Sequence, residues 1–319
     1  MASSVQMPND HRRCACSARA SCTVLAMRTP RNPDGDAPLW KRMAFELKCA
    51  VKRQIAPKGV PVTPPDEPYL IVAILGQSNA YGMGLPLDPD GADRPHPRVH
   101  QWANSGPSKN TVVLGADPLF HETPARRVGF GVTFGKALAD ATNRAVLLVP
   151  CARGDTSFHP KNGYTWDIAD THTRRNLYRE AVRSIDAALT HRAGSTVAAV
   201  LWHQGESDVP LMSAPQYQRH LDALFDDLRA RYGKDTPIIL GGMVPEEMER
   251  SGKDYPPIDA VHRDTPDRRH RAAFVPGNRG MFNSDVDRHY NAAGIRAMGH
   301  DMWLAYQRIA ADDLAEYRR

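Results

Sequence analysis

Residues 69–79 read Tyr-Leu-Ile-Val-Ala-Ile-Leu-Gly-Gln-Ser-Asn, an apolar run that ends in a glycine and three polar residues. Such a run is typical of a strand that is buried on both faces of a sheet. Apolar segments of the same character recur at 145–149, 197–202 and 237–240. Segments with helical spacing lie between and beyond them, at 131–142, 174–191, 216–232 and from about 292 onward. This alternation predicts an α/β fold in which a mostly parallel sheet lies between two layers of helices.

The composition of the chain is that of a globular protein. Of its 319 residues, 41% are hydrophobic and 24% are charged, and no apolar run approaches the roughly 20 residues of a membrane span. The net charge is +5, and residues 1–65 hold 11 Lys and Arg against 4 Asp and Glu. The rest of the chain holds 30 basic and 32 acidic residues, so its net charge is −2. We therefore expect no nucleic-acid partner.

We interpret residues 1–65 as a basic extension before a domain that spans 66–319. Residues 1–36 have no sustained periodicity, which predicts a largely disordered segment. The apolar stretch at 22–27 is too short for a signal peptide, which favours the cytoplasm, with secretion as the alternative. Five prolines at 56–68 predict a linker, because proline neither continues a helix nor fits a central strand.

The segment 38–55 predicts an amphipathic helix, because its apolar residues recur at helical spacing. These residues are Leu39, Trp40, Met43, Leu47, Val51 and Ile55. Five basic residues lie between them, which is typical of a helix that binds an anionic membrane surface. The alternative, which we favour, is a helix that packs against the folded domain.

The chain has five cysteines, and only Cys151 lies beyond residue 65. An odd number with this distribution does not indicate a disulfide framework. Cys14, Cys16 and Cys22 have no matching distal pair of ligands, so we expect free thiols there and no metal site.

Polar residues follow three of the predicted strands, at the edge where open parallel sheets bind ligands. Ser78 follows the first strand on a tight turn, where a hydroxyl can act as a nucleophile and its own amide can bind an oxyanion. Gly154 follows the second strand and allows close backbone approach to a ligand. After the third strand, residues 202–208 read Trp-His-Gln-Gly-Glu-Ser-Asp, in which Gln204 offers side-chain N–H donors. The spacing of the acidic residues and the histidine there favours hydrogen bonding over metal binding.

A histidine with nearby carboxylates lies close to the C-terminus. Asp285 and Asp287 precede His289 by four and two residues. A carboxylate can hold one tautomer of an imidazole, so that the other ring nitrogen serves as a base. Both aspartates remain candidates for this role.

Residues 69–305 resemble the SGNH hydrolases, and more narrowly the sialate O-acetylesterase-type carbohydrate esterases. Five motifs carry the resemblance. They are Gly76-Gln77-Ser78-Asn79, Val128-Gly129-Phe130-Gly131, Ala152-Arg153-Gly154-Asp155-Thr156-Ser157, the segment 202–208, and His289-Tyr290-Asn291-Ala292-Ala293-Gly294. The resemblance implies a flavodoxin-like three-layer fold.

The resemblance also implies the role of each site residue. Ser78 corresponds to the nucleophile and His289 to the base, while the amides of Ser78 and Gly154 and the side chain of Gln204 correspond to the oxyanion hole. The family usually has an aspartate three residues before the histidine, where this chain has Val286. We favour Asp285 over Asp287, because Ser284-Asp285 resembles the start of the family motif with one residue inserted.

The resemblance implies a serine esterase that removes O-acetyl groups from a carbohydrate and needs no metal or organic cofactor. A non-catalytic carbohydrate-binding relative and an esterase for lipid or small acyl esters are the alternatives. Further substrate contacts are expected from Gln77, Asn79, Glu206 and Trp166.

Overall fold

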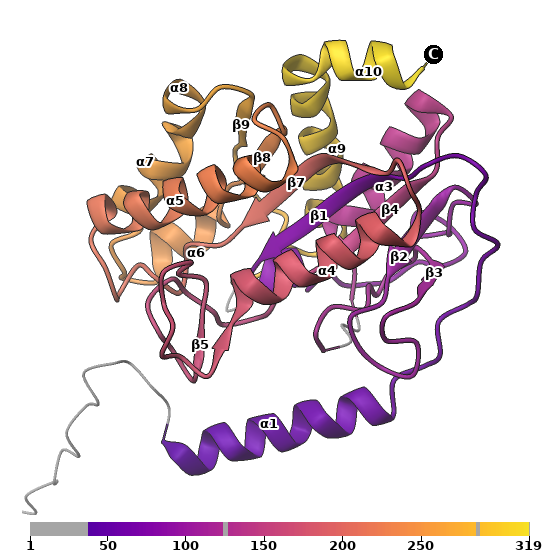
Figure 1. Ribbon diagram of the computed structural model, residues 1–319. Coiled ribbons are helices and arrows are strands. Elements are labelled where there is room, and N and C mark those ends of the chain that lie inside the picture. Colours follow the sequence, from indigo (N-terminus) through magenta and orange to yellow (C-terminus); the bar gives the residue numbers. More distant parts are fainter. Residues whose placement is uncertain (1–37, 124–126, 285–287, 319) are drawn as a thin grey trace, which may run out of the picture. The chain divides into compact units, whose positions relative to one another are not determined.

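The computed structural model describes residues 38–123, 127–284 and 288–318. A seven-stranded sheet in the order β3-β2-β4-β1-β7-β8-β9 forms its centre (Figure 1). The strands are β1 (Leu70–Gly76), β2 (Val99–Trp102), β3 (Val112–Leu114), β4 (Val146–Pro150), β7 (Thr196–His203), β8 (Ile238–Gly241) and β9 (Ala272–Val275). All neighbouring strands are parallel except β2 and β3. The mostly parallel α/β architecture expected from the sequence is confirmed.

Strand β1 lies in the middle of the sheet, where the strand order changes direction. The chain places β2 and β4 on one side of β1 and β7, β8 and β9 on the other. All seven residues of β1 are buried, as the unbroken apolar run predicts. The loops that follow β1, β4 and β7 therefore meet at one edge of the sheet, which is where such sheets bind ligands.

Helices cover both faces of the sheet (Figure 1). One core includes α4 (Leu177–His191), α5 (Ala214–Tyr232) and α7 (Pro256–Arg263), and the other includes α3 (Phe130–Thr142), α9 (Ala292–Ile309) and α10 (Ala311–Tyr317). Ile71 and Ala73 of β1 belong to the first core, and Val72 and Ile74 belong to the second. This alternation follows from the two-residue period of a strand.

The remaining elements are short. They are α2 (Ser78–Tyr81), β5 (Tyr164–Thr165), β6 (Arg175–Asn176), α6 (Pro245–Arg250) and α8 (Thr265–Arg268). The helix expected from residue 174 begins at Leu177, because the side chain of Asn176 caps it and accepts a hydrogen bond from the Arg179 amide at 3.0 Å.

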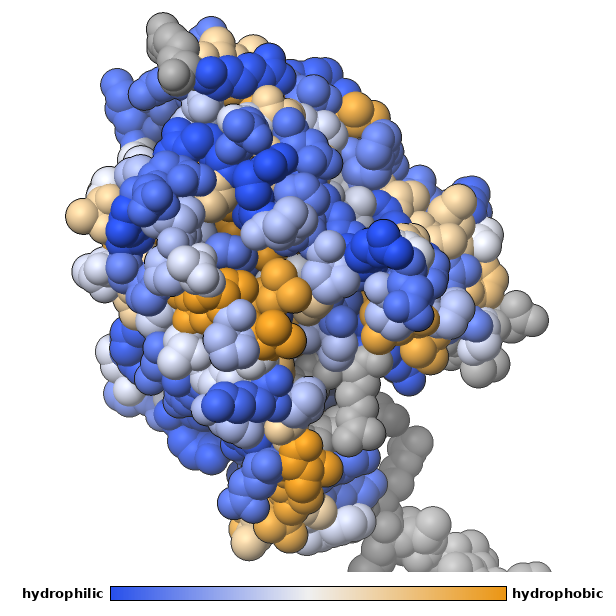
Figure 2. All heavy atoms as spheres, turned by 90° about the vertical axis from the view of Figure 1, so that its right-hand side faces the viewer, coloured by the Kyte–Doolittle hydropathy of each residue, from blue (hydrophilic) through white to orange (hydrophobic). Residues whose placement is uncertain are grey.

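The expected N-terminal helix is present as α1 (Leu39–Gln54), but it contacts the rest of its unit through a mainly polar face. Cys49 is buried and Glu46 and Arg53 are half-buried, and all three face the domain. The apolar residues that predicted the helix are exposed instead. They are Leu39, Trp40, Met43, Leu47, Val51 and Ile55. Figure 2 shows hydrophobic surface on this helix at the bottom of the molecule.

Residues 34–319 group together as one unit, which contains α1. The predicted domain boundary at residue 66 stays a prediction. The expected disorder of residues 1–36 and the free thiols of Cys14, Cys16 and Cys22 lie outside the described residues. In the described ranges, no helix has both the length and the apolar character needed to cross a bilayer.

Candidate active site

Ser78 lies on a turn that is packed tightly against β7. Gly76 has a φ of +124°, and a Cβ atom at this position would lie 2.1 Å from the carbonyl oxygen of His203. The next amide, of Gln77, donates a hydrogen bond to that same oxygen at 2.8 Å. Only glycine therefore fits at position 76, and the turn places Ser78 as the first residue of α2 at the end of β1.

The loop that follows β4 lies beside this turn. The Arg153 amide donates to the Gly76 carbonyl oxygen at 3.0 Å, and a Cβ atom on Gly154 would lie 3.9 Å from the Cβ atom of Ser78. Among the described residues, neither the Ser78 amide nor the Gly154 amide has a hydrogen-bond acceptor. Two adjacent backbone donors without a protein partner can stabilise an oxyanion.

A cavity of about 540 Å³, which we call the Ser78 cavity, opens at this edge of the sheet. Ser78, Gly154 and His289 all line it, although they belong to three distant segments of the sequence. With Gln77, the structure thus brings four of the predicted site residues to one cavity. Asp285 and Asp287, the two candidates for the acid, lie outside the described residues.

Asn79 and Glu206 connect segments of the site and do not line the Ser78 cavity. Asn79 is fully buried, and its Oδ1 accepts a hydrogen bond from the Tyr290 amide at 3.3 Å. Its Nδ2 donates to Glu206 Oε1, also at 3.3 Å. The sequence interpretation of these two residues as substrate contacts is corrected, because burial leaves them no access to a ligand in this structure.

Gln204 does not line the Ser78 cavity, but its Nε2 lies 3.4 Å from Oε1 of Gln77, which does. Gln204 is fully buried, and its Nε2 donates to Asp208 Oδ2 at 2.7 Å and to the Thr156 carbonyl oxygen at 3.2 Å. Its Oε1 accepts a hydrogen bond from the Tyr217 hydroxyl at 3.1 Å. Both protons of the amide nitrogen thus have acceptors within the protein, which leaves none for an oxyanion. The role of Gln204 as an oxyanion donor, which the family resemblance implied, stays a prediction.

Asp208 completes this buried polar network. Its carboxylate accepts hydrogen bonds from the amides of Phe158 and His159 at 2.9 and 3.2 Å. Burial raises the pKa of Asp208 to about 6. The network therefore holds the loop after β4 against the loop after β7.

Trp166 is part of the hydrophobic core and cannot form a platform for a sugar. It is fully buried, and its ring lies edge-on to Trp202 with the ring centroids 5.4 Å apart. Its indole N–H donates to Thr156 Oγ1 at 3.0 Å. Gln77, in contrast, lines the Ser78 cavity, and its role as a substrate contact stays a prediction.

The structure adds residues that no sequence pattern indicated. Nδ1 of His121 accepts a hydrogen bond from the Ala152 amide at 3.0 Å. Ala152 precedes Gly154 by two residues. Burial lowers the pKa of His121 to about 3, so this histidine is neutral and keeps its acceptor. Phe45, Lys48 and Cys49 of α1 line the Ser78 cavity as well. An isolated histidine and a helix that lies before residue 66 have no local signal that connects them to Ser78.

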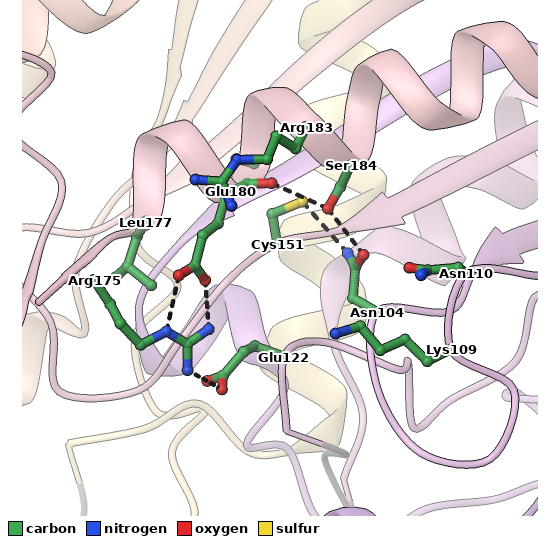
Figure 3. Close-up of a pocket in the computed structure, with 11 residues that line it drawn as sticks. Asn104, Lys109, Asn110, Glu122, Cys151, Arg175, Leu177, Glu180, Arg183 and Ser184 are labelled. Carbon is green, nitrogen blue, oxygen red and sulfur yellow. Dashed lines mark hydrogen bonds and ion pairs between the residues drawn. The ribbon is translucent and has the colours of Figure 1, made fainter.

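A second cavity, of about 300 Å³, contains Cys151 (Figure 3). Arg175 forms ion pairs with Glu122 and Glu180 on its wall, and the Asn104 amide donates to the Cys151 thiol at 3.6 Å. Burial raises the pKa of this thiol to about 12, which keeps it protonated and a poor nucleophile. Within the described ranges, no group of three or more His, Cys, Asp and Glu side chains could hold a metal ion.

Comparisons of the sequence agree with the motifs. The family described as "Carbohydrate esterase, sialic acid-specific acetylesterase" matches residues 68–308. A probable 9-O-acetyl-N-acetylneuraminic acid deacetylase of Escherichia coli (strain K12) is 29% identical over 217 residues, which are 54% of this chain and 66% of that protein. A probable carbohydrate esterase of Arabidopsis thaliana is 29% identical over 187 residues, which are 52% of this chain and 65% of that protein. Each match spans just under two thirds of the relative.

Solved structures have the same fold. The crystal structure of NanS superposes with a TM-score of 0.64 at 22% identity, covering 79% of this chain and all of that one. An X-ray structure of an Arabidopsis thaliana protein has a TM-score of 0.62 at 21% identity and covers 76% of this chain and 99% of that one. The fold, the motif order and the family match across 68–308 lead to one conclusion: the chain belongs to the sialic acid-specific acetylesterase family of carbohydrate esterases.

Proposed function

We propose that this protein is a serine esterase that removes O-acetyl groups from a carbohydrate. The observation that carries the proposal is that Ser78, Gly154 and His289 line one cavity at the carboxyl edge of the sheet. The Escherichia coli relative is named as a probable deacetylase of 9-O-acetyl-N-acetylneuraminic acid. An O-acetylated sialic acid is therefore the first substrate to test.

The proposed mechanism has two steps. His289 takes the proton of the Ser78 hydroxyl while its Oγ attacks the ester carbonyl. The amides of Ser78 and Gly154 donate to the developing oxyanion. The sugar hydroxyl leaves with the proton from His289, and the acetyl group remains on Ser78. Water that is activated by His289 then attacks the acetyl-enzyme and releases acetate.

An aspartate completes the proposed triad. Asp285 or Asp287 would hold His289 in the tautomer that accepts the serine proton. We favour Asp285, on the motif argument from the sequence. The mechanism needs no metal ion, since a serine nucleophile with backbone donors is a sufficient set of groups.

Acetate release from 9-O-acetyl-N-acetylneuraminic acid and hydrolysis of p-nitrophenyl acetate test the proposal. We expect Ser78→Ala and His289→Ala to lower kcat by about 10⁶-fold while the far-UV spectrum and melting temperature are kept. Ser251→Ala and His300→Ala are matched controls outside the Ser78 cavity and keep wild-type rates. Equal low rates in wild type, Ser78→Ala and His289→Ala with both esters would overturn the proposal and favour a non-catalytic carbohydrate-binding role.

A further inference from the structure

The α1 helix is attached to the domain through ion pairs that converge on Arg153. Glu46 of α1 accepts a hydrogen bond from Arg153 Nη2 at 3.2 Å and another from the Tyr164 hydroxyl. Arg153 is only 5% exposed, and its guanidinium group lies over the Tyr164 ring, 3.8 Å from the ring centroid. Because Arg153 directly precedes Gly154, the helix is attached to the same loop that supplies the proposed oxyanion donor.

Glu122 makes a second attachment. It forms ion pairs with Arg53 of α1, with Arg153 and with Arg175, the last of which is visible in Figure 3. Burial raises the pKa of Glu122, but the arginines beside it outweigh this effect and hold the pKa below its usual value. This ionised carboxylate thus joins α1 and the loop after β4 over a wide pH range.

Residues of α1 next to Glu46 line the Ser78 cavity. Phe45, Lys48 and Cys49 line it together with Ser78 and His289. Phe45 also lines a neighbouring cavity of about 250 Å³, which shares Arg153, Gly154 and Asp155 with the Ser78 cavity. The helix ends at Gln54, before the region 68–308 that matches the family. The family match therefore assigns no role to these residues.

Among the described residues that line the Ser78 cavity, basic side chains outnumber acidic ones. Lys48, Arg153 and Arg288 line it, and Asp155 is the acidic residue among the described lining residues. Arg153 is paired with Glu46 and Glu122, and Asp155 is paired with Lys161 at 2.5 Å. Lys48 is exposed and has no ion pair within the described part of the chain. An anionic group on a bound substrate would supply the missing partner.

We propose that α1 is a substrate-binding wall of the active site, in which Lys48 binds an anionic group of the acetylated substrate and Phe45 packs against its uncharged part. This inference rests on the proposed function for the identity of the substrate. It adds a specificity determinant from a segment that precedes the family region. The chemistry that Lys48 recognises is a carboxylate on the sugar.

Binding to a protein that cannot turn over separates this inference from the proposed function. The ligands are 9-O-acetyl-N-acetylneuraminic acid and its C1 carboxamide, which lacks the negative charge and has an NH2 group in place of one carboxylate oxygen. Isothermal titration calorimetry in the Ser78→Ala background measures the affinity for each ligand. We expect Lys48→Ala to weaken binding of the acid about tenfold, to leave the carboxamide unchanged, and to be rescued by Lys48→Arg. Lys234→Ala, at an exposed position outside the cavity, serves as the control.

A second pair of variants tests the wall itself. Phe45 and Leu47 lie on the same helix and are 52% and 66% exposed, but only Phe45 is among the residues that line the cavity. Phe45→Ala should weaken the binding of both ligands, and Leu47→Ala should leave the affinity for both unchanged. Equal effects of Lys48→Ala on the acid and the carboxamide, or equal effects of the two apolar variants, would overturn the inference. Failure of wild type to release acetate would contradict the proposed function alone, since the binding result does not depend on turnover.

Discussion

Asn79 Oδ1 accepts a hydrogen bond from the Tyr290 amide at 3.3 Å, across a separation of 211 residues in the sequence. This bond joins the turn that carries Ser78 to the segment that carries His289. On its other side, Asn79 Nδ2 donates to Glu206 Oε1, so three loops at the edge of the sheet meet at one buried amide. The distance between the proposed nucleophile and the proposed base therefore depends on a buried residue that does not line the Ser78 cavity.

Replacement of Asn79 tests this positioning role. We expect Asn79→Ala to lower kcat by about 10²-fold with little change in KM, because a small displacement of a base is costly to proton transfer. Steady-state kinetics with p-nitrophenyl acetate measure both constants. A variant in which KM rises and kcat is kept would show that Asn79 binds substrate instead.

Gln204→Ala distinguishes a structural role from an oxyanion role. The substitution removes one of the three hydrogen bonds to the Asp208 carboxylate and one partner of the Tyr217 hydroxyl, so we expect the free energy of unfolding to fall by about 1–3 kcal/mol. Urea denaturation measures this change. A donor that acts only on the oxyanion would show the opposite pattern, with kcat lowered by about 10²–10³-fold and the stability unchanged.

Asp285→Asn and Asp287→Asn identify the acid of the triad. We expect Asp285→Asn to lower kcat by about 10⁴-fold, as loss of the orienting carboxylate does in serine hydrolases, and Asp287→Asn to change it little. The assay is acetate release at saturating substrate. The reverse order would assign the role to Asp287, and two near-normal variants would mean that His289 works without either carboxylate.

His121 predicts a pH dependence of stability. Burial lowers the pKa of His121 to about 3, whereas an exposed histidine has a pKa of about 6.5, so the unfolded chain binds more protons between these two pH values. The contribution of neutral His121 to the free energy of unfolding is fully present above about pH 6.5. It is lost as the pH falls toward 3, by up to about 1.4 kcal/mol per pH unit. In the variant His121→Asn, the side-chain oxygen can accept the hydrogen bond of the Ala152 amide, but the side chain does not titrate.

The measurement for His121 is urea denaturation of wild type and His121→Asn between pH 7 and pH 4. The variant should show a smaller loss of stability with falling pH, whatever its stability at pH 7. Parallel curves for the two proteins would mean that His121 has the same pKa in the folded and unfolded states.

Gly76→Ala tests the close packing of the turn at Ser78, and Gly252→Ala serves as its control. Both glycines have positive φ, +124° and +69°, but a Cβ atom on Gly252 would meet nothing within 4 Å. Gly252→Ala should cost about 1–2 kcal/mol of stability through its backbone alone. Gly76→Ala should prevent folding to a soluble protein, because its Cβ would overlap the His203 carbonyl. Similar melting temperatures for the two variants would contradict the close packing of β1 on β7.

The sequence predicted the central features of the fold because these features have local signals. The run at 69–75 is apolar throughout, since β1 is buried on both faces, and it is found as the central strand. Strands β2, β3 and β9, of three or four residues, were not predicted, because such short segments have little pattern of their own. Strand β8 is as short, but it was predicted because a segment with helical spacing at 216–232 precedes it. The place of β2, β3 and β9 comes from pairing with neighbouring strands.

For the site, the sequence by itself determined which segments meet. Ser78 and Gly154 follow parallel strands, and parallel strands bring their carboxyl ends to one edge. The tertiary structure alone decided which side chains reach the cavity. It turned Gln204 toward Asp208, enclosed Asn79, Glu206 and Trp166, and brought the polar face of α1 to the domain. The physical reason is that the direction of a side chain depends on packing and hydrogen bonds with residues far away in the sequence, which no local pattern records.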